Sequence, residues 1–157
     1  MATDIKAKRF TDGTAAAATT IAAAQTLGGA GNMTLAGTAA TFGGTNLGQK
    51  ITLVSTGNIS AVTFTITGTD PTGASQTEDL TGPNNSTVTS TKYFNTVTQI
   101  AASGAVGTNT SSGVAADQGG TLFAGRTRVR GMHAVNAGAG TILFNNSSID
   151  GSEILGV

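Results

Sequence analysis

The stretch ISAVTFTITGTDPTGASQTEDLTGP, residues 59–83, has the residue pattern of a β-hairpin. In its first half, Val62, Phe64 and Ile66 alternate with polar residues, mostly threonines. Successive side chains of a strand point to opposite faces of a sheet. The spacing therefore predicts a strand with one buried, apolar face and one exposed, hydroxyl-bearing face.

The residues in the middle of this stretch predict a tight turn. Pro71 presets φ at the first corner, Asp70 can accept hydrogen bonds within the turn, and Gly73 tolerates the positive φ needed to leave it. The segment SQTEDLTG, residues 75–82, is then the returning strand. The stretch builds sheet and contains no nucleophile motif, metal-ligand cluster or phosphate-binding loop.

Short runs of similar composition lie on both sides of the hairpin. They are rich in β-branched residues and are separated by turn-forming segments: NMTLAG (32–37), QKITLVST (49–56) and TVTSTKYF (87–94). Short strands separated by turns are typical of antiparallel all-β domains. We therefore predict an all-β fold, with an antiparallel β-sandwich over residues 30–108.

The segment FNTVTQIAASG, residues 94–104, gives a mixed signal. Phe94, Val97 and Ile100 are three residues apart, which fits one face of a helical turn. Threonine is β-branched, however, and favours strands. We expect a strand that contains a β-bulge.

Residues 1–29 match neither the strand nor the helix period. Their large apolar residues, Ile5, Phe10, Ile21 and Leu27, are widely and irregularly spaced. We predict an extended N-terminal arm. Basic residues followed by a small-residue stretch imitate a signal peptide, but that stretch contains no Leu, Phe or Val, so we do not expect cleavage.

Residues 109–120 are small and polar, with Val114 as their one large apolar residue, and predict a linker. Residues 121–157 contain two strand-like runs joined at NAGAG (136–140), with a contiguous apolar run at 142–144. So short a piece does not make an independent sheet. We expect a small β module that the first module or a neighbouring subunit completes.

The composition excludes several classes of protein. Eight basic and eight acidic residues cancel, which gives no reason to expect nucleic acid or an anionic membrane surface as a partner. No cysteine is present, which excludes disulfides and thiolate zinc sites. No apolar run is long enough for a transmembrane helix. Six Phe, one Tyr and no Trp predict a core of modest size.

The basic residues gather in two places, near the N-terminus and late in the chain. In the late cluster, RTRVR places alternate arginines on one face of a strand, which suits an acidic partner. A solvated edge that deters unwanted strand pairing explains the same pattern equally well. DNA is a weaker third interpretation, because no aromatic platform lies nearby. The candidate partner-binding residues are Lys6, Lys8, Arg9, Phe10, Arg126, Arg128 and Arg130.

Patterns for catalysis or metal binding are weak. Glu78 and Asp79 are adjacent, so on a strand they point to opposite faces and cannot act as an acid and base pair. His133 is the single histidine, and no serine lies in a G-x-S-x-G motif. The turn at Asp70 lacks the alternating oxygen ligands of a calcium loop. We expect no enzymatic activity and no cofactor.

Three segments together resemble a known protein family. GNMTLAG (31–37), ITLVSTGNISAVTFTITGTDPTGASQTEDLTGP (51–83) and STKYFNTVTQIAASG (90–104) are similar to a module of uncharacterised virion proteins of tailed bacteriophages. The resemblance covers roughly residues 29–108. GRTRVRGMHAVNAGAGTILFNNSS (125–148) resembles the β modules of phage head-decoration and tail-associated proteins, although their longer continuation is absent.

This resemblance implies a structural protein of the virion, assembled in the host cytoplasm. The first expectation is a capsid decoration (cement) protein that stabilises the head through contacts of its arm and strand edges. Its partners would be copies of itself and the major capsid protein or other virion proteins, with no small-molecule substrate. A tail component, such as an adaptor, nozzle or fibre-base protein, is the alternative, followed by a carbohydrate-binding or receptor-binding module.

Overall fold

The computed structural model describes residues 8–121, 143–145 and 153–156. The chain divides into two units, residues 1–120 and 121–157, which we describe separately. Lys6, Arg126, Arg128, Arg130 and His133 lie outside the described residues.

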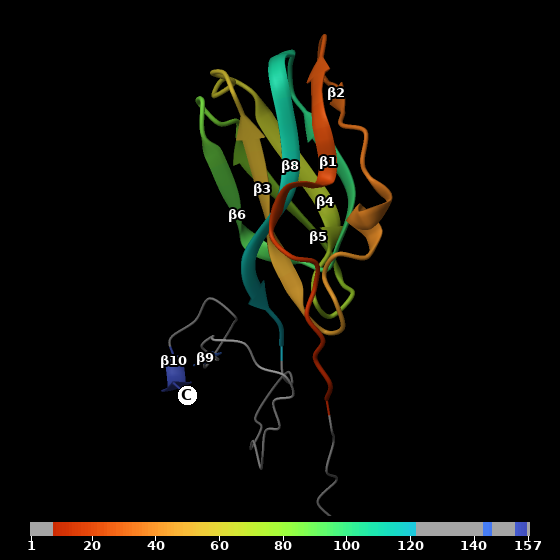
Figure 1. Ribbon diagram of the computed structural model, residues 1–157, viewed down its shortest axis with the longest axis vertical. Coiled ribbons are helices and arrows are strands. Elements are labelled where there is room, and N and C mark those ends of the chain that lie inside the picture. The colour runs from red at the N-terminus through yellow and green to blue at the C-terminus, as the bar shows by residue number, and fades with distance from the viewer. Residues whose placement is uncertain (1–7, 122–142, 146–152, 157) are drawn as a thin grey trace, which may run out of the picture. The chain divides into compact units, whose positions relative to one another are not determined.

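The first unit is an antiparallel β-sandwich (Figure 1). One sheet has the strand order β1-β8-β3-β6 and consists of β1 (Ala17–Leu27), β8 (Val106–Gly119), β3 (Gly48–Ser55) and β6 (Thr87–Phe94). The other has the order β2-β7-β4-β5 and consists of β2 (Gly31–Asn32), β7 (Thr96–Ala102), β4 (Thr63–Thr69) and β5 (Ser75–Thr81). A short 3-10 helix, η1 (Gly37–Ala40), follows β2. The predicted all-β sandwich is confirmed.

The core lies between the two sheets and is built from few large side chains. Phe42, Phe64 and Phe94 are fully buried, and aliphatic residues from both sheets pack with them. On β4 the predicted alternation is present, since Phe64 and Ile66 are buried while Thr63 is exposed. Burial of apolar surface is the main stabilising term here.

The predicted hairpin is confirmed as β4 and β5, which pair in register from Thr63↔Thr81 to Thr69↔Ser75. In its turn, the Oδ1 atom of Asp70 accepts hydrogen bonds from the N–H groups of Thr72 (2.7 Å) and Ala74 (3.0 Å). Gly73 has a φ of 88°, a region that side chains disfavour. Asp70 and Gly73 therefore have the roles that their chemistry predicts.

The predicted bulge is also present, in β7. Along the pairing of β4 with β7, Thr67 lies opposite Gln99 and Gly68 lies opposite Val97, so Thr98 is an extra residue on β7. The extra residue shifts the alternation by one position, and as a result Val97 and Ile100 both face the core. The three-residue spacing in the sequence is thus that of a bulged strand.

The prediction of a linker at 109–120 is wrong. Residues 109–119 belong to β8, a long central strand that pairs with β1 on one side and β3 on the other. Ser111 and Ser112 are buried, and a Cβ atom at Gly113 would lie 1.8 Å from the main-chain oxygen of Ala17. Only small residues fit where β1 passes so closely, which is why the segment resembles a linker in composition.

The prediction of an extended arm is wrong for residues 17–27, which form edge strand β1. Their register against β8 slips several times between Ala17 and Leu27, so no period of two survives in the sequence. Ile21 and Ala22 alone are fully buried. The run NMTLAG also differs from its prediction, because strand β2 contains only Gly31 and Asn32 before the chain turns into η1.

In the second unit the described residues form two short strands. β9 (Leu143–Asn145) pairs antiparallel with β10 (Glu153–Gly156). A strand near residues 142–144 was expected from the sequence, whereas β10 was not.

Candidate attachment end of the sandwich

One open side of the sandwich is closed by side chains of β5 that reach the main chain of β6. Glu78 accepts hydrogen bonds from the N–H groups of Thr91 (2.7 Å) and Lys92 (2.9 Å). Gln76 donates its amide to the carbonyl of Tyr93 at 2.6 Å. These bonds connect the edge strands of two different sheets, and they occupy main-chain groups that an added strand would need.

An irregularity in β6, larger than an ordinary β-bulge, explains why these N–H groups point outward. Ile51 of β3 lies opposite three residues of β6, Ser90, Thr91 and Lys92. The Ser90 hydroxyl accepts the hydrogen bond of the Ile51 N–H at 2.8 Å and donates to the Lys92 carbonyl at 2.8 Å. The Ser90 hydroxyl thus takes the place of the missing main-chain partner of Ile51 between β3 and β6. Glu78 binds the N–H groups of Thr91 and Lys92, which are turned away from β3.

The opposite side is closed by the segment that follows β2. The Ala36 N–H donates to the Ile21 carbonyl at 2.8 Å, and the Thr38 hydroxyl donates to the Thr20 carbonyl. Met33, Ala39 and Phe42 of this segment are buried in the core. The outer edge of β1 is therefore covered by residues of its own chain.

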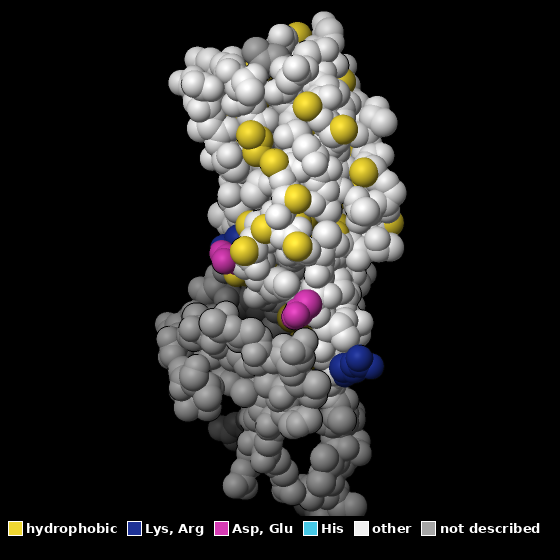
Figure 2. Space-filling model, viewed as in Figure 1, with side chains coloured by type: hydrophobic (Ala, Val, Ile, Leu, Met, Phe, Trp, Pro, Cys, Tyr) yellow, Lys and Arg dark blue, Asp and Glu magenta, His cyan; other side chains and the backbone are white. Residues whose placement is uncertain are grey.

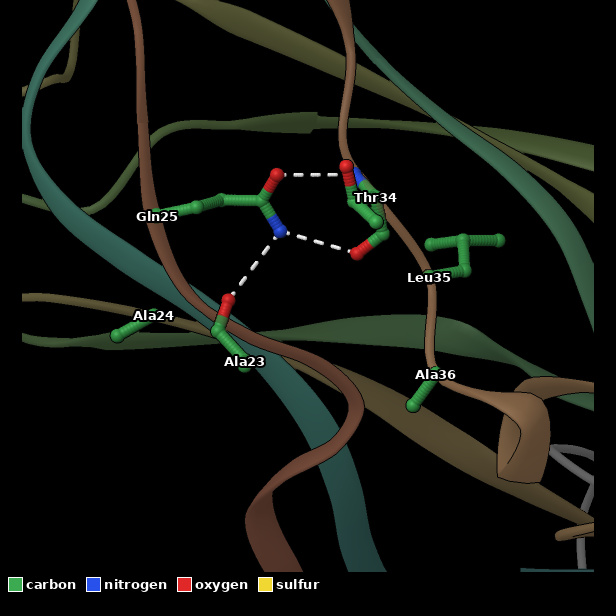
Figure 3. Close-up of a pocket in the computed structure, with 6 residues that line it drawn as sticks. All are labelled: Ala23, Ala24, Gln25, Thr34, Leu35 and Ala36. Atoms are coloured by element: carbon green, nitrogen blue, oxygen red, sulfur yellow. Dashed lines mark hydrogen bonds between the residues drawn. The ribbon is translucent and has the colours of Figure 1, made fainter.

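A shallow pocket lies on this side, lined by Ala23, Ala24, Gln25, Thr34, Leu35 and Ala36 (Figure 3). The Gln25 amide is fully occupied there: its oxygen accepts the Thr34 N–H at 2.8 Å, and its nitrogen donates to the carbonyls of Thr34 and Ala23. The remaining lining is mostly aliphatic and has no ionisable group. The pocket therefore offers no ionisable group for acid or base chemistry.

At one end of the sandwich, Asn46 connects the N-terminal segment to the end of the first unit. Its Nδ2 atom donates to the Arg9 carbonyl at 2.8 Å. A Cβ atom at Gly120 would lie 2.2 Å from the Asn46 carbonyl oxygen, so these two main-chain segments are in direct contact. Next to Asn46, Thr11 and Thr45 form an isolated β-bridge. We call this group, Arg9, Thr11, Thr45, Asn46 and Gly120, the Asn46 junction.

The conformation of Asn46 is unusual, with a φ of 58°. Asparagine tolerates this left-handed region better than most residues. The surrounding loop is fixed by Asn95, whose Nδ2 atom donates to the carbonyls of Gly44 (3.0 Å) and Leu47 (2.6 Å). The loop is therefore rigidly placed to hold both neighbouring segments.

The N-terminal segment is fastened to its own sandwich over several residues, and Figure 1 shows it crossing the ends of β8 and β3. The Gly13 N–H donates to Gln118 of β8, and the Thr14 N–H donates to the Phe42 carbonyl. Gln49, which is buried, donates to the Thr14 carbonyl at 2.8 Å. The part of the predicted arm that the structure describes is thus held by its own unit.

Three of the predicted partner-binding residues lie at this end. The Lys8 ammonium is 5.6 Å from the centroid of the Phe10 ring, within the range of a cation–π contact. Arg9 has an exposed side chain while its carbonyl is bound by Asn46. The structure brings Lys8, Arg9 and Phe10 together, and the other four candidates lie outside the described residues.

Charge is unevenly distributed over the described surface. On the face drawn in Figure 2, basic and acidic side chains lie in the half toward the N-terminal segment, and the other half shows uncharged side chains. Charged side chains set the orientation and rate of association more than its strength. The charged half is therefore the part of this face best suited to orient a partner.

The acidic residues of the hairpin serve its structure. Burial by itself raises the pKa of Asp70, but hydrogen bonds from Thr72, Ala74 and Gly73 outweigh this and lower the pKa below its ordinary value. Asp79 accepts the Thr65 hydroxyl at 2.6 Å. Among the described residues, no group of three or more histidine, cysteine or acidic residues could hold a metal ion.

Sequence reasoning missed Asn46, Asn95 and Gln49, which hold distant segments together. Each belongs to a polar run that by itself indicates a turn or an exposed strand position. The one available signal was local: Asn46 follows two glycines in the sequence GGTN, residues 43–46. Such a cluster of Gly and Asn marks a turn or loop.

No protein-family model matches the chain, and comparisons with curated proteins and with solved structures found no match. Within the described residues, no helix has the length and apolar character needed to span a membrane.

Proposed function

We propose that the chain is a structural virion protein of a tailed bacteriophage, acting as a capsid decoration (cement) protein that stabilises the head. Its partners are copies of itself and the major capsid protein or other virion proteins, and its location is the virion. The proposal takes the virion role from the resemblance of residues 29–108 to phage virion modules. The Asn46 junction supplies the structural support.

The junction supports the proposal because it brings Arg9 and Gly120 to the same loop. The chain before Arg9 and the chain after Gly120 therefore leave the sandwich at one end. These flanking segments contain the remaining predicted partner-binding residues, Lys6, Arg126, Arg128 and Arg130. A module whose two flanking chain segments leave from the same end is suited to attachment to a larger surface at that end, with the rest of the sandwich projecting from the surface.

We propose a mode of attachment that differs from the strand-edge contacts expected from the sequence. Strand addition at β6 or β1 would have to displace the bonds of Glu78, Gln76 and the segment 33–38. We therefore assign attachment to the end that contains Lys8, Arg9 and Phe10, and not to the lateral edges.

A receptor-binding or carbohydrate-binding role receives less support. Sugar rings stack on exposed aromatic faces, and the single tyrosine, Tyr93, is half-buried. Its ring is contacted by the Lys50 ammonium, 5.0 Å from the centroid, and a Cβ atom at Gly119 would lie 3.0 Å from ring atoms. The ring is thus engaged by its own chain.

The copy number of the chain in purified particles tests the proposal. Quantitative mass spectrometry against the major capsid protein should find copies in proportion to the capsid lattice. A number that fits a single ring would replace the decoration role with a tail component, and absence from the particle would refute both. In reconstituted binding to particles stripped of the chain, Arg9→Glu should weaken binding, whereas Lys92→Glu, with the same charge change on β6, should not.

A further inference from the structure

The N-terminal part of the first unit lies against two buried polar atoms that have no hydrogen-bond partner. Among the described residues these atoms are Gln49 Oε1 and Ser112 Oγ, and both side chains are at most 1% exposed. A Cβ atom at Gly13 would lie 2.7 Å from Gln49 Oε1, so the N-terminal segment covers this atom. Ser112 of β8 lies opposite Ala22 of β1. Both atoms are thus kept from water by the part of the chain that precedes residue 28.

Little stabilisation opposes the release of this part of the chain. A buried polar group without a partner has lost its hydrogen bonds to water and gained none in the protein, so release of residues 13–22 relieves an unfavourable term twice. Ile21 and Ala22 are the two buried residues among the eleven of β1. The register of β1 against β8 shifts three times. Strands with so little burial and such irregular pairing open at low free energy.

A glycine-rich hinge follows β1. Residues 28–30, with the sequence Gly-Gly-Ala, connect β1 to β2 of the other sheet. A Cβ atom at Gly28 or at Gly29 would have no heavy atom within 4 Å apart from its chain neighbours, so surrounding side chains do not fix this connection. Glycine also adopts a wide range of backbone conformations. The connection can therefore straighten and let β1 leave while the other sheet keeps its strands.

The edge of β8 that β1 would leave is shaped for this same strand. At Gly113 the absence of a side chain makes room for the main chain of Ala17. Beyond the strand, the amide of Asn46 binds the carbonyl of Arg9. Without β1, β8 is an edge strand, and its unpaired main-chain groups favour pairing with another strand. A second copy of the chain supplies the one segment that matches all of these contacts.

We propose that residues 8–27 exchange between two copies of this chain, so that β1 of each copy pairs with β8 of the other. Exchange of an identical element re-forms the contacts that the closed chain makes, which leaves the local concentration of copies to decide between the two forms. The inference rests on the proposed function for its purpose, because decoration proteins lie close together on a capsid and exchanged strands would link them.

Disulfide trapping in the full chain tests the exchange. The chain contains no cysteine, and Thr11 and Thr45 face each other in an isolated antiparallel bridge, a spacing that a disulfide can span. Thr11→Cys and Thr45→Cys chains with different isotope labels are mixed at high concentration under mild oxidation. A disulfide-linked heterodimer should accumulate several-fold above the level reached with Thr11→Cys and Thr63→Cys, whose cysteine is exposed on β4 of the other sheet.

Hydrogen exchange in two variants at adjacent positions of β8 tests the release of β1. Ser112→Ala removes the unpartnered hydroxyl and should slow amide exchange in β1 by about tenfold. Gly113→Ala should speed it, because the new methyl group would overlap the main chain of Ala17.

Three results would overturn the inference. They are equal heterodimer formation in the two cysteine mixtures, equal protection of β1 and β3 in the wild type, and the same exchange rate of β1 in Ser112→Ala and Gly113→Ala. Because these measurements use no particles, their failure leaves the copy number in the virion as a separate test of the proposed function.

Discussion

Glu78 of β5 accepts two hydrogen bonds from Thr91 of β6, one from the main-chain N–H at 2.7 Å and one from the hydroxyl at 2.9 Å. The two residues belong to different sheets, so their contact joins the halves of the sandwich along an open side. Charged acceptors make stronger hydrogen bonds than neutral ones. This pair is therefore the first place to test what holds the sheets together.

Replacing Glu78 with Gln should destabilise the protein by about 1–2 kcal/mol, because the amide keeps one acceptor and turns a donor toward the N–H of Lys92. Urea denaturation followed by circular dichroism measures the free energy of unfolding. Asp79→Asn is the matched control, since the neighbouring side chain is exposed and binds only the Thr65 hydroxyl. Equal losses for both variants would contradict the role assigned to Glu78.

Gly113→Ala should displace the start of β1, because the new methyl group would overlap the main chain of Ala17. Overpacking of this kind costs about 1–3 kcal/mol. Hydrogen exchange should show lost protection in β1 while β4 and β5 keep theirs. Gly107→Ala on the same strand has open space around it and serves as the control. If both variants are equally stable, the close passage of β1 over β8 is wrong.

The turn at Asp70 predicts a pH dependence of stability. Its pKa is lower in the folded protein than the ordinary value of 3.8, so the ionised carboxylate favours the folded state. The contribution is complete above the unfolded pKa and is lost as the pH falls through the folded pKa. Asp70→Asn should therefore be less stable than the wild type at pH 7, and the difference should shrink below pH 3.8. A difference that stays constant down to the most acidic conditions would contradict this assignment.

Asn46→Gly should loosen the N-terminal segment without straining the loop, because glycine accepts the φ of 58° but has no amide to bind the Arg9 carbonyl. Limited trypsin digestion should cleave after Arg9 several-fold faster than in the wild type. The matched control is Asn85→Gly, which makes the same change at the other non-glycine residue with positive φ among the described residues. Unchanged cleavage in Asn46→Gly would show that the segment is held by its other contacts alone.

The hairpin and the bulged strand could be predicted because their side chains carry the information locally. Val62, Phe64 and Ile66 define a buried face by their spacing, and the turn at Asp70 uses three residues of distinct backbone preference. Prediction from local residue patterns failed for β1 and β8. Their residues are small because two parts of the chain nearly a hundred positions apart pass within contact distance at Ala17 and Gly113. Only the tertiary structure distinguishes such a strand from a linker.

The candidate site was predicted in part for a similar reason. Lys8, Arg9 and Phe10 stand out as a local cluster of charge and aromatic surface in a chain with few of either. The role of Asn46 depends on two partners, Arg9 and Gly120, that are distant from it in sequence. No local sequence pattern specifies that Asn46 contacts these two residues. The charge cluster was thus predictable, and the residue that positions it was not.

The carboxylate of Glu78 also bears on solubility under crowding. In the proposed decoration role, many copies would lie side by side on one surface and present their edge strands to one another at high local concentration, a condition under which exposed edges seed amyloid-like fibrils. With the Thr91 and Lys92 N–H groups already occupied, neighbouring copies cannot propagate a continuous sheet through β6. In that role, Glu78 would keep densely arranged copies from pairing through their β6 edges.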